Sequence, residues 1–483
     1  MSAGAAVSPA SAHASMHRRQ WLVWFTTFLG LLARPWRRAV DAAGTSQPAS
    51  ARRGGVVRWI WTGGLTSTSV SIVTRIVDGL APVQVRLTPS GGGPAVTADA
   101  ERADLDASGI CRFRIDGLRP ATAYIYQVVQ AGIAAGPSGR VRTPAAGPHN
   151  TLILFGSCAS TGSNAPIWDT MRALSPDLFV HMGDLHYQNI TRNDPARFRA
   201  AFDRCLTSPR QGAFYRTVPI AYVWDDHDFG GDESTRHATS AEAAHTAYRE
   251  CVPHYPLRGG PRDTIQQAFD IGRVRVIVTD VRSARDMPDR RDGSVPSMLG
   301  AAQLRWLLDE FEAASRRAAL VVWANGVPWI TKADEGTHHG WAPYHEERAL
   351  IAAQIERVGL TSRLLMVSGD AHMVAIDDGT NSQYAPGAAP GSRGFVVAHA
   401  AAFDRFRRNK GGPYSLGRRA GRGQFGELRI QDDGRRLVAT VTCRDARGRQ
   451  IDKLSIRLTC VDGTCTVSQP GPQAPLFEHL GAA

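Results

Sequence analysis

The chain has 483 residues, of which 43% are hydrophobic and 8% aromatic, so it can bury sizeable cores and is not a disordered polypeptide. Its formal net charge of +12 favours an anionic substrate or surface, although arginine-rich genomic composition would give the same balance. Because no arginine-rich run is interleaved with aromatic residues, a sequence-specific nucleic-acid surface is not predicted. The length is typical of two or three domains.

Residues 1–54 are predicted to be a targeting segment followed by a linker. Arg18 and Arg19 precede an apolar stretch at 21–33, which is too short to cross a membrane comfortably. The first interpretation is a signal peptide, and the arginine pair is loosely like a twin-arginine export signal. Because further arginines follow the stretch, a membrane anchor within residues 20–38, or an N-terminus that starts later, stays open. We expect an exported protein, periplasmic or extracellular, either free or membrane-anchored.

Residues 55–143 are predicted to form an all-β, fibronectin- or immunoglobulin-like sandwich. Apolar and polar residues alternate in runs at 70–76, 83–87, 111–115 and 124–128, and turns rich in glycine, proline and aspartate separate these runs. The segment 117–126 resembles the E-to-F corner of a fibronectin type III domain. Such a module is expected to position or shield a site rather than to catalyse.

Residues 144–468 are predicted to form an α/β sandwich, because strand-like runs alternate with helical ones. Strands are expected at 152–155, 177–180, 218–223, 274–280, 319–324 and 363–367, and helices at 166–174, 195–206, 241–251 and 301–318. Later strands at 395–398, 427–430, 437–443 and 455–460, with a hairpin turn at 432–434, are expected to complete the second sheet. Residues 469–483 are predicted to be poorly ordered.

Four polar clusters directly follow apolar, strand-like runs. They are Gly156-Ser157-Cys158, Gly183-Asp184-Leu185-His186-Tyr187, Trp224-Asp225-Asp226-His227-Asp228 and Ser368-Gly369-Asp370-Ala371-His372. Ligand sites of α/β folds lie at the carboxyl ends of buried strands. The clusters are therefore predicted to share one pocket.

The side chains in these clusters suit a pair of metal ions that binds one phosphate. Asp184 is the natural carboxylate to bridge both ions, and a Cys158 thiolate or a Tyr187 tyrosinate suits Fe(III) better than Mg or Ca. Further ligands are available from Asp226, Asp370 and His372, and His227 is placed to hydrogen-bond a phosphate oxygen.

Together with the segment Ala324-Asn325-Gly326-Val327-Pro328-Trp329, these motifs resemble, in their order, those of the alkaline phosphatase D (PhoD-like) family of calcineurin-type metallophosphatases. The resemblance is strong over about residues 150–440. For the preceding sandwich it extends only to the type of domain. It implies a fold like that of purple acid phosphatases, with a fibronectin-like domain in front. It also implies metal-dependent hydrolysis of phosphoesters by a hydroxide that two metals activate.

The resemblance also implies roles for individual residues. Fe(III) would be held by Cys158, Asp184, Tyr187 and His372, and Ca²⁺ by Asp184, Asp226, Asn325 and Asp370. Because such enzymes carry a metal-binding Asn directly before a catalytic His, Asp226 and His227 correspond to that pair, and Asp228 could orient His227. Trp341 and Tyr344 are implied to lie over the substrate entrance.

Several of these residues have plainer interpretations, which stay open. Tyr187 could be core packing, Asn325 a turn residue and Asp228 a cap of the following loop. Three more histidines, at 338, 339 and 345, are better explained by a solvated loop than by another metal site. His186 either supports the metal ligands from behind or is merely exposed. Arg192 is a candidate to bind the substrate phosphate.

Export would permit disulfides among the six cysteines other than Cys158. Cys460 and Cys465 flank a tight turn, and one of them could reach Cys443 on a neighbouring strand. The pairing cannot be deduced from the sequence, and the spacing of a zinc ribbon is absent.

The sequence therefore predicts an alkaline phosphatase that acts on phosphomonoesters and also on phosphodiesters, small or polymeric, as a monomer. One alternative is a phosphodiesterase or phospholipase-like enzyme acting on anionic polymers or lipids, which the basic charge favours. An alternative of another class is an inactive, surface-attached binding protein. Every expected ligand position holds a capable side chain, which argues against the inactive form.

Overall fold

The computed structural model describes residues 56–77, 82–101, 108–289, 293–331, 339–406 and 410–470. Contacts within the chain separate 1–52 from 53–483, which is one compact unit. The predicted targeting segment and most of the predicted C-terminal tail lie outside the described residues. The described helices include none that is both long and apolar enough to span a bilayer. The domain boundaries near residues 143 and 468 stay predictions.

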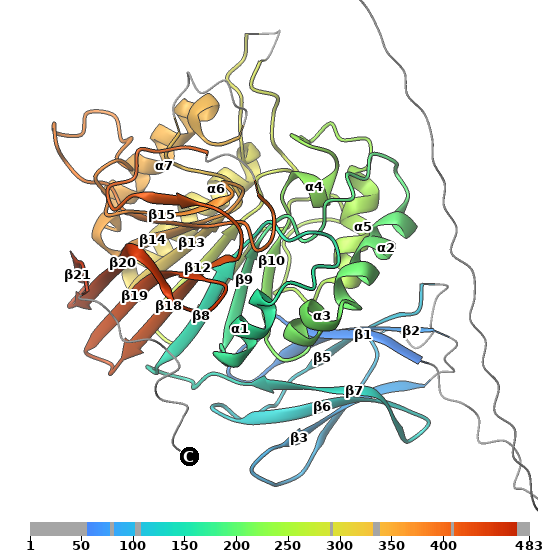
Figure 1. Ribbon diagram of the computed structural model, residues 1–483. Helices are drawn as coiled ribbons and strands as arrows, with labels where there is room; N and C mark the ends of the chain where they lie inside the picture. Colours follow the sequence, from blue (N-terminus) through green and yellow to red (C-terminus); the bar gives the residue numbers. More distant parts are fainter. Residues whose placement is uncertain are drawn as a thin grey trace, which may run out of the picture. The chain divides into compact units, whose positions relative to one another are not determined.

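Two large β-sheets face each other and carry the predicted strand-end clusters (Figure 1). The first has ten strands, in the order β21 (Thr464–Ser468), β20 (Gln450–Val461), β19 (Arg436–Asp445), β18 (Gln424–Asp432), β8 (Thr151–Gly156), β9 (Leu178–Met182), β10 (Ile220–Val223), β1 (Val56–Gly63), β2 (Val70–Val77) and β5 (Ile110–Ile115). The second has seven strands, in the order β11 (Gln267–Ile271), β12 (Val274–Thr279), β13 (Leu320–Asn325), β14 (Leu364–Ser368), β16 (Val396–Ala400), β15 (Met373–Asp377) and β17 (Arg418–Ala420).

Strands β8, β9 and β10 run parallel in the first sheet, as do β12, β13, β14 and β16 in the second. Their carboxyl ends therefore lie at one edge of each sheet. The late strands differ from the prediction, because β18 pairs antiparallel with β8 and brings β19 and β20 into the first sheet. Only β16 of the late strands joins β14 in the second sheet.

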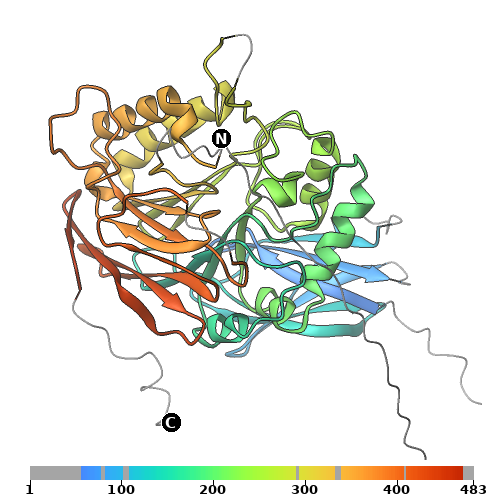
Figure 2. The same ribbon diagram turned by 45° about the horizontal axis from the view of Figure 1, so that its top comes forward.

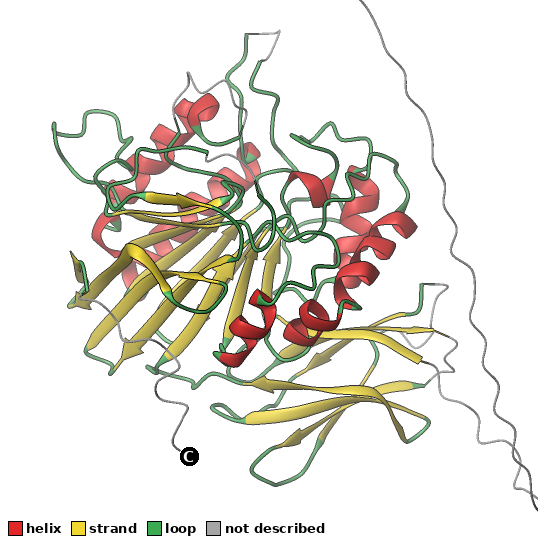
Figure 3. Ribbon diagram, in the orientation of Figure 1, coloured by secondary structure: helices red, strands yellow, loops and turns green. Residues whose placement is uncertain are grey.

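Helices cover the outer faces of the two sheets, which gives four layers (Figures 2 and 3). The first sheet is covered by helices between residues 167 and 251, and the second by α6 and α7. The helices are α1 (Ile167–Ala173), α2 (Pro195–Leu206), α3 (Pro209–Tyr215), α4 (Asp226–Phe229), α5 (Ala241–Cys251), α6 (Gly300–Arg317) and α7 (His345–Arg357), with 3₁₀ turns η2 (Ala342–Tyr344) and η3 (Thr361–Arg363). The predicted α/β sandwich is confirmed.

The predicted β-sandwich is also present before the joint at residue 143. Strands β1, β2 and β5 face a four-stranded sheet whose order is β4 (Val96–Asp99), β3 (Val83–Pro89), β6 (Ala123–Gln130) and β7 (Ile133–Arg142). The Tyr124 hydroxyl accepts a hydrogen bond of 2.9 Å from the Arg119 amide, as at the tyrosine corner of such sandwiches. The sandwich is continuous with the α/β part of the chain, because β1 pairs with β10 at Gly63 and Ile220 and so joins the first sheet.

One disulfide lies in the described part of the chain and links Cys460 to Cys465 across the β20–β21 hairpin. Cys443 is a buried free thiol, so the alternative in which it pairs with one of these two is not seen.

A histidine in the core makes the fold sensitive to acid. The ring of His181, on β9, lies among Phe179, Tyr222 and Phe403, and its two nitrogens have no hydrogen-bond partner within the described residues. Burial lowers the pKa of His181 from 6.5 to about 3. In the unfolded chain this histidine takes up a proton near pH 6.5, whereas in the folded chain it stays neutral, so stability falls as the pH drops from about 6.5 to about 3.

We predict that His181→Leu makes the acid side of the stability profile shallower. Since each pKa unit corresponds to about 1.4 kcal/mol, the variant should avoid a loss of about 2 kcal/mol at pH 5. Urea unfolding of both proteins at pH 5 and pH 7.5 measures this difference. An equal loss in the wild type and the variant would show that His181 does not carry it.

Candidate metal centre

Five strand ends meet at the candidate centre, and glycines permit the close approach of their loops. Gly183, after β9, has φ +94°, and a Cβ there would lie 2.3 Å from the Asp225 Cβ. A Cβ on Gly369, after β14, would lie 2.8 Å from both the Ser157 hydroxyl and the Met182 carbonyl oxygen. A side chain at either position would push the loops apart. The glycines of the Gly-Asp motifs thus bring the aspartates together.

The first ligand group combines sulfur, oxygen and nitrogen. The atoms that Cys158, Asp184 and His372 offer to a metal lie within 4.8 Å of one another. Cys158 Sγ is 3.5 Å from Asp184 Oδ2. The Tyr187 hydroxyl is 2.5 Å from the same oxygen and 3.4 Å from His372 Nε2. The structure therefore brings together all four residues of the predicted iron site.

Four residues of the centre have left-handed backbone conformations, which are rare outside glycine. The φ values are +63° for Cys158, +57° for Asp184, +58° for Asp370 and +50° for His372. Each such conformation costs of order 1 kcal/mol or more and persists only where the surroundings fix it. All four residues are predicted metal ligands, and strained backbone at the ligands is typical of a preorganised site.

The second ligand group consists mainly of carboxylates. Asp184 lies with Asp226 and His227 in one cluster and with Asp225 and Asp370 in another, so Asp184 belongs to three of the four possible ligand groups among the described residues. Asn325 ends β13, directly beside Ser368 at the end of β14. Of the two predicted calcium ligands on these strand ends, Asp370 therefore lies beside Asp184, and Asn325 lies on the strand that neighbours that of Asp370. Asp225 and Asp226 are both close enough to Asp184 to be the remaining carboxylate ligand.

Four buried oxygens in this group, Asp184 Oδ1, Asp225 Oδ2, Asn325 Oδ1 and Asp370 Oδ2, have no hydrogen-bond donor among the described residues. A buried acceptor without a donor costs about 1–3 kcal/mol, so a cluster of them is unusual in a folded protein. The Nδ2 group of Asn325 donates to the Val327 carbonyl, which leaves Oδ1 as the atom that faces a ligand.

Repulsion among the carboxylates is strong. Burial and the charges of Asp226 and Asp225 raise the pKa of Asp184 well above its usual value. Burial and the Asp184 carboxylate likewise raise the pKa values of the Cys158 thiol and the Tyr187 hydroxyl. Bound cations would favour the ionised form of all three groups and would pair the orphaned oxygens. The donor set therefore fits a metal centre.

Two cationic side chains of the protein, one fully and one largely buried, offset part of this negative charge, and neither was predicted from the sequence. Arg282 is fully buried, with Nε 2.5 Å from Asp225 Oδ1 and Nη2 3.6 Å from Asp226 Oδ2. Lys410 Nζ lies 2.6 Å from Asp370 Oδ1. Although burial opposes ionisation, the Lys410 ammonium holds the pKa of Asp370 below its usual value. Lys410 is one of only three lysines in the chain, but it lies in no motif.

His339 also belongs to the centre, which corrects the prediction of a solvated loop for this residue. Its Nδ1 atom contacts Glu233, and it lies 3.8 Å from Asp370 Oδ2 and 3.1 Å from Lys410 Nζ. His345 is exposed at the start of α7, as predicted, and His338 lies outside the described residues.

His227 lies at the edge of the ligand groups with a well-defined orientation. Its Nδ1 atom is 2.5 Å from Asn189 Oδ1, its Nε2 atom is 3.5 Å from Asp232, and its ring packs against that of Tyr187 at a tilt of 37°, with centroids 4.2 Å apart. Burial lowers its pKa, although the neighbouring carboxylates oppose this.

Asp228 does not orient His227, contrary to the prediction. Its carboxylate accepts hydrogen bonds from the amides of Leu185 and Asp225 and from the Tyr222 hydroxyl, at 2.9, 2.6 and 2.6 Å. The alternative, in which Asp228 caps the loop, agrees better with these contacts, because they tie the loop after β9 to the start of α4.

Trp341 and Tyr344 are fully buried, which corrects their predicted place over the entrance. Trp341 packs against Trp323 and Trp329, and the Tyr344 hydroxyl donates to the Asp286 carbonyl. Both aromatic side chains fill the core of the second sheet and are inaccessible to a substrate.

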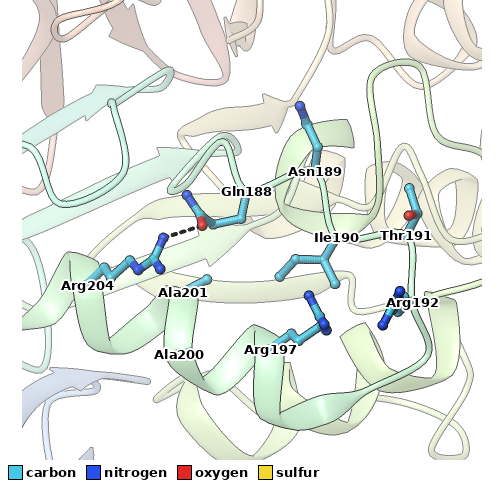
Figure 4. Close-up of a pocket in the computed structure, with 9 residues that line it drawn as sticks. All are labelled: Gln188, Asn189, Ile190, Thr191, Arg192, Arg197, Ala200, Ala201 and Arg204. Atoms are coloured by element: carbon cyan, nitrogen blue, oxygen red, sulfur yellow. Dashed lines mark hydrogen bonds between the residues drawn. The ribbon is translucent and has the colours of Figure 1, made fainter.

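His186 is also buried, between Phe198 and Phe202, so the exposed interpretation is wrong. Arg192 lies outside the ligand groups and lines a neighbouring pocket together with Asn189 (Figure 4).

Comparisons with known proteins were consistent with this geometry. Residues 153–399, about half of the chain, match the family model of the PhoD-like phosphatases. A solved structure of PhoD is similar, with TM-score 0.67 and 18% identity over 89% of this chain and 95% of that one. A purple acid phosphatase from yellow lupin (Lupinus luteus) seeds is also similar, with TM-score 0.60 and 12% identity over 89% of this chain and 79% of that one. A search of the curated proteins found no match.

We predict that Arg282→Met destabilises the fold by about 3–5 kcal/mol, because it leaves Asp225 and Asp226 buried without their counter-charge. Denaturant unfolding in the presence of a chelator measures the loss without a cation that could replace the guanidinium. Arg305→Met, at an exposed position of α6, is the matched control and should change stability by less than about 0.5 kcal/mol. If the two variants were equally stable, Arg282 would not be the counter-charge of this cluster.

Proposed function

The chain belongs to the PhoD-like phosphatase family and is a metal-dependent phosphoric ester hydrolase; from this premise we propose an alkaline phosphatase that cleaves phosphomonoesters and phosphodiesters. The observation that carries the proposal is the position of Asp184, whose Oδ2 contacts Cys158 and Tyr187 of the first ligand group and which also groups with Asp226 and with Asp225 and Asp370. A carboxylate shared in this way is what two ions bridging one phosphate require.

We propose iron in the first group and calcium in the second. The thiol of Cys158 and the phenol of Tyr187 favour Fe(III), whereas carboxylate and amide oxygens from Asp226, Asn325 and Asp370 favour Ca²⁺. Bound there, the ions would neutralise charge on the phosphoryl oxygens and make water a stronger nucleophile.

The protein's own groups would then position the reaction. Lys410 keeps Asp370 ionised and so available as a ligand. His227, fixed by Asn189 and Tyr187, is placed to donate a hydrogen bond to a phosphoryl oxygen or to the leaving oxygen. Asn189 therefore takes the positioning role that the resemblance implied for Asp228.

The proposal includes export of the protein. The disulfide between Cys460 and Cys465 supports an oxidising compartment, as does the basic and apolar pattern of the N-terminal segment. A monomer acting on a small or polymeric phosphoester is proposed, with membrane association through residues 20–38 as an open alternative.

We predict that Asp184→Ala and His227→Ala fail in different ways. Asp184→Ala should lose bound metal and activity together, because the residue serves both ligand groups. His227→Ala should retain its metal and lose about 100-fold in kcat, the usual contribution of one proton donor. Metal content per chain and turnover of an aryl phosphate, measured at alkaline pH on the same samples, separate the two effects.

The control is Glu346→Ala, at an exposed carboxylate in the first turn of α7, which should keep both metal and activity. Full activity of metal-replete Asp184→Ala would show that the centre has been assigned to the wrong residues. Comparing monoester and diester substrates decides between the phosphatase and the phosphodiesterase.

A further inference from the structure

A pocket of about 250 Å³ lies beside the candidate metal centre (Figure 4). Its walls are the loop after β9, residues 188–192, and one face of α2 that includes Arg197, Ala201 and Arg204. The pocket belongs to neither ligand group, and the proposed reaction assigns it no role.

The pocket contains three guanidinium groups and little negative charge. Arg192 has no acceptor for its side chain in the described residues, and Arg204 donates to the neutral amide of Gln188 at 2.5 Å. Arg197 lies 3.5 Å from Asp194, but that carboxylate is half-exposed and caps the start of α2. Figure 4 shows the ends of the Arg192 and Arg197 side chains turned toward the same space. Both side chains are exposed, so solvent screens their mutual repulsion and both guanidinium groups are accessible to an anion.

The pocket adjoins the predicted proton donor. Asn189, in its wall, contacts His227 Nδ1 at 2.5 Å. A substrate whose phosphate lies at the metal centre and whose leaving group passes His227 would therefore extend toward this pocket. Ile190 and Ala201 line it with apolar surface that suits a carbon chain.

We propose that this pocket is an anionic subsite, in which Arg192 and Arg197 bind a second phosphate or carboxylate of the substrate beyond the scissile bond. Guanidinium groups form paired hydrogen bonds with both anions. The inference rests on the proposed function and narrows its substrate class to phosphoesters that carry a second negative group on the leaving-group side. Repeating phosphodiesters and bisphosphates have this chemistry.

The test uses three substrates of matched chain length: an n-alkyl phosphate, the bisphosphate of the corresponding diol, and a phosphate whose chain ends in a carboxylate. The natively purified protein should cleave at least one doubly charged substrate with a kcat/KM about tenfold above that of the alkyl phosphate. Arg192→Gln and Arg197→Gln should each remove much of that preference by raising KM, with kcat and the alkyl phosphate unchanged, because the contact is the same in the ground and transition states. The preferred end group decides between phosphate and carboxylate.

Arg305→Gln, an exposed arginine on α6, matches the change in net charge and should keep the preference. Calorimetric titration with an alkane bisphosphonate and the corresponding monophosphonate, which are not hydrolysed, tests binding independently of turnover. We expect the wild type to bind the bisphosphonate about tenfold more tightly than the monophosphonate. The Arg192→Gln, Arg197→Gln double variant should bind the two phosphonates with equal affinity.

Equal affinity of the wild type for both phosphonates, or a preference that the double variant retains, would overturn the subsite. Failure of the protein to cleave any of the three phosphates, with the bisphosphonate still preferred, would instead contradict the proposed function and leave the subsite supported.

Discussion

The structure depends on the burial of several carboxylates at one point. Asp184, Asp225, Asp226 and Asp370 lie at the ends of three strands from two sheets, and all four side chains are nearly inaccessible to solvent. Among the described residues, the fully buried Arg282 and the largely buried Lys410 contact these carboxylates and oppose their mutual repulsion. Burying charge without compensation is too unfavourable for a fold to tolerate. Positive charge from bound metal is the simplest way to complete this balance.

The N-terminal sandwich contributes to the position of the site, although it supplies none of the ligand groups. Trp59, on β1, donates to Asp203 on α2, and Trp61 donates to the Cys251 carbonyl at the end of α5. Arg75, on β2, also contacts Asp203. Helix α2 forms one wall of the pocket that is lined by Arg192, Arg197 and Arg204. These contacts therefore hold that wall against the first sheet. The sandwich thus has the positioning role that was expected of such a module, through strand pairing and through α2.

Much of the centre could be predicted because its ligands follow recognisable strands. Apolar runs located β8, β9, β10 and β14, and the Gly-Asp motifs after them marked the tight turns that bring Asp184 and Asp370 together. The helices α2 and α5 were predicted with the bounds that the structure has. These features are local, so the pattern of neighbouring residues is enough to reveal them.

The features that were missed depend on contacts between distant segments. Lys410 reaches the centre from a loop without a motif, His339 was assigned to a solvated loop, and Arg282 is one arginine among many in a basic chain. Asp228, the next residue in the sequence, was predicted to orient His227. The residue that contacts the His227 ring nitrogen is instead Asn189, which approaches from the loop after β9. Trp341 and Tyr344 were placed by resemblance alone, and burial of a large aromatic side chain cannot be inferred from position in a motif.

The most direct test of the account is elemental analysis of the natively purified protein. If the buried carboxylates, Cys158 and Tyr187 form a metal centre, the protein should carry about one iron and at least about one calcium per chain. Absence of bound metal, both after native purification and after reconstitution, would contradict the central claim that cations balance this cluster.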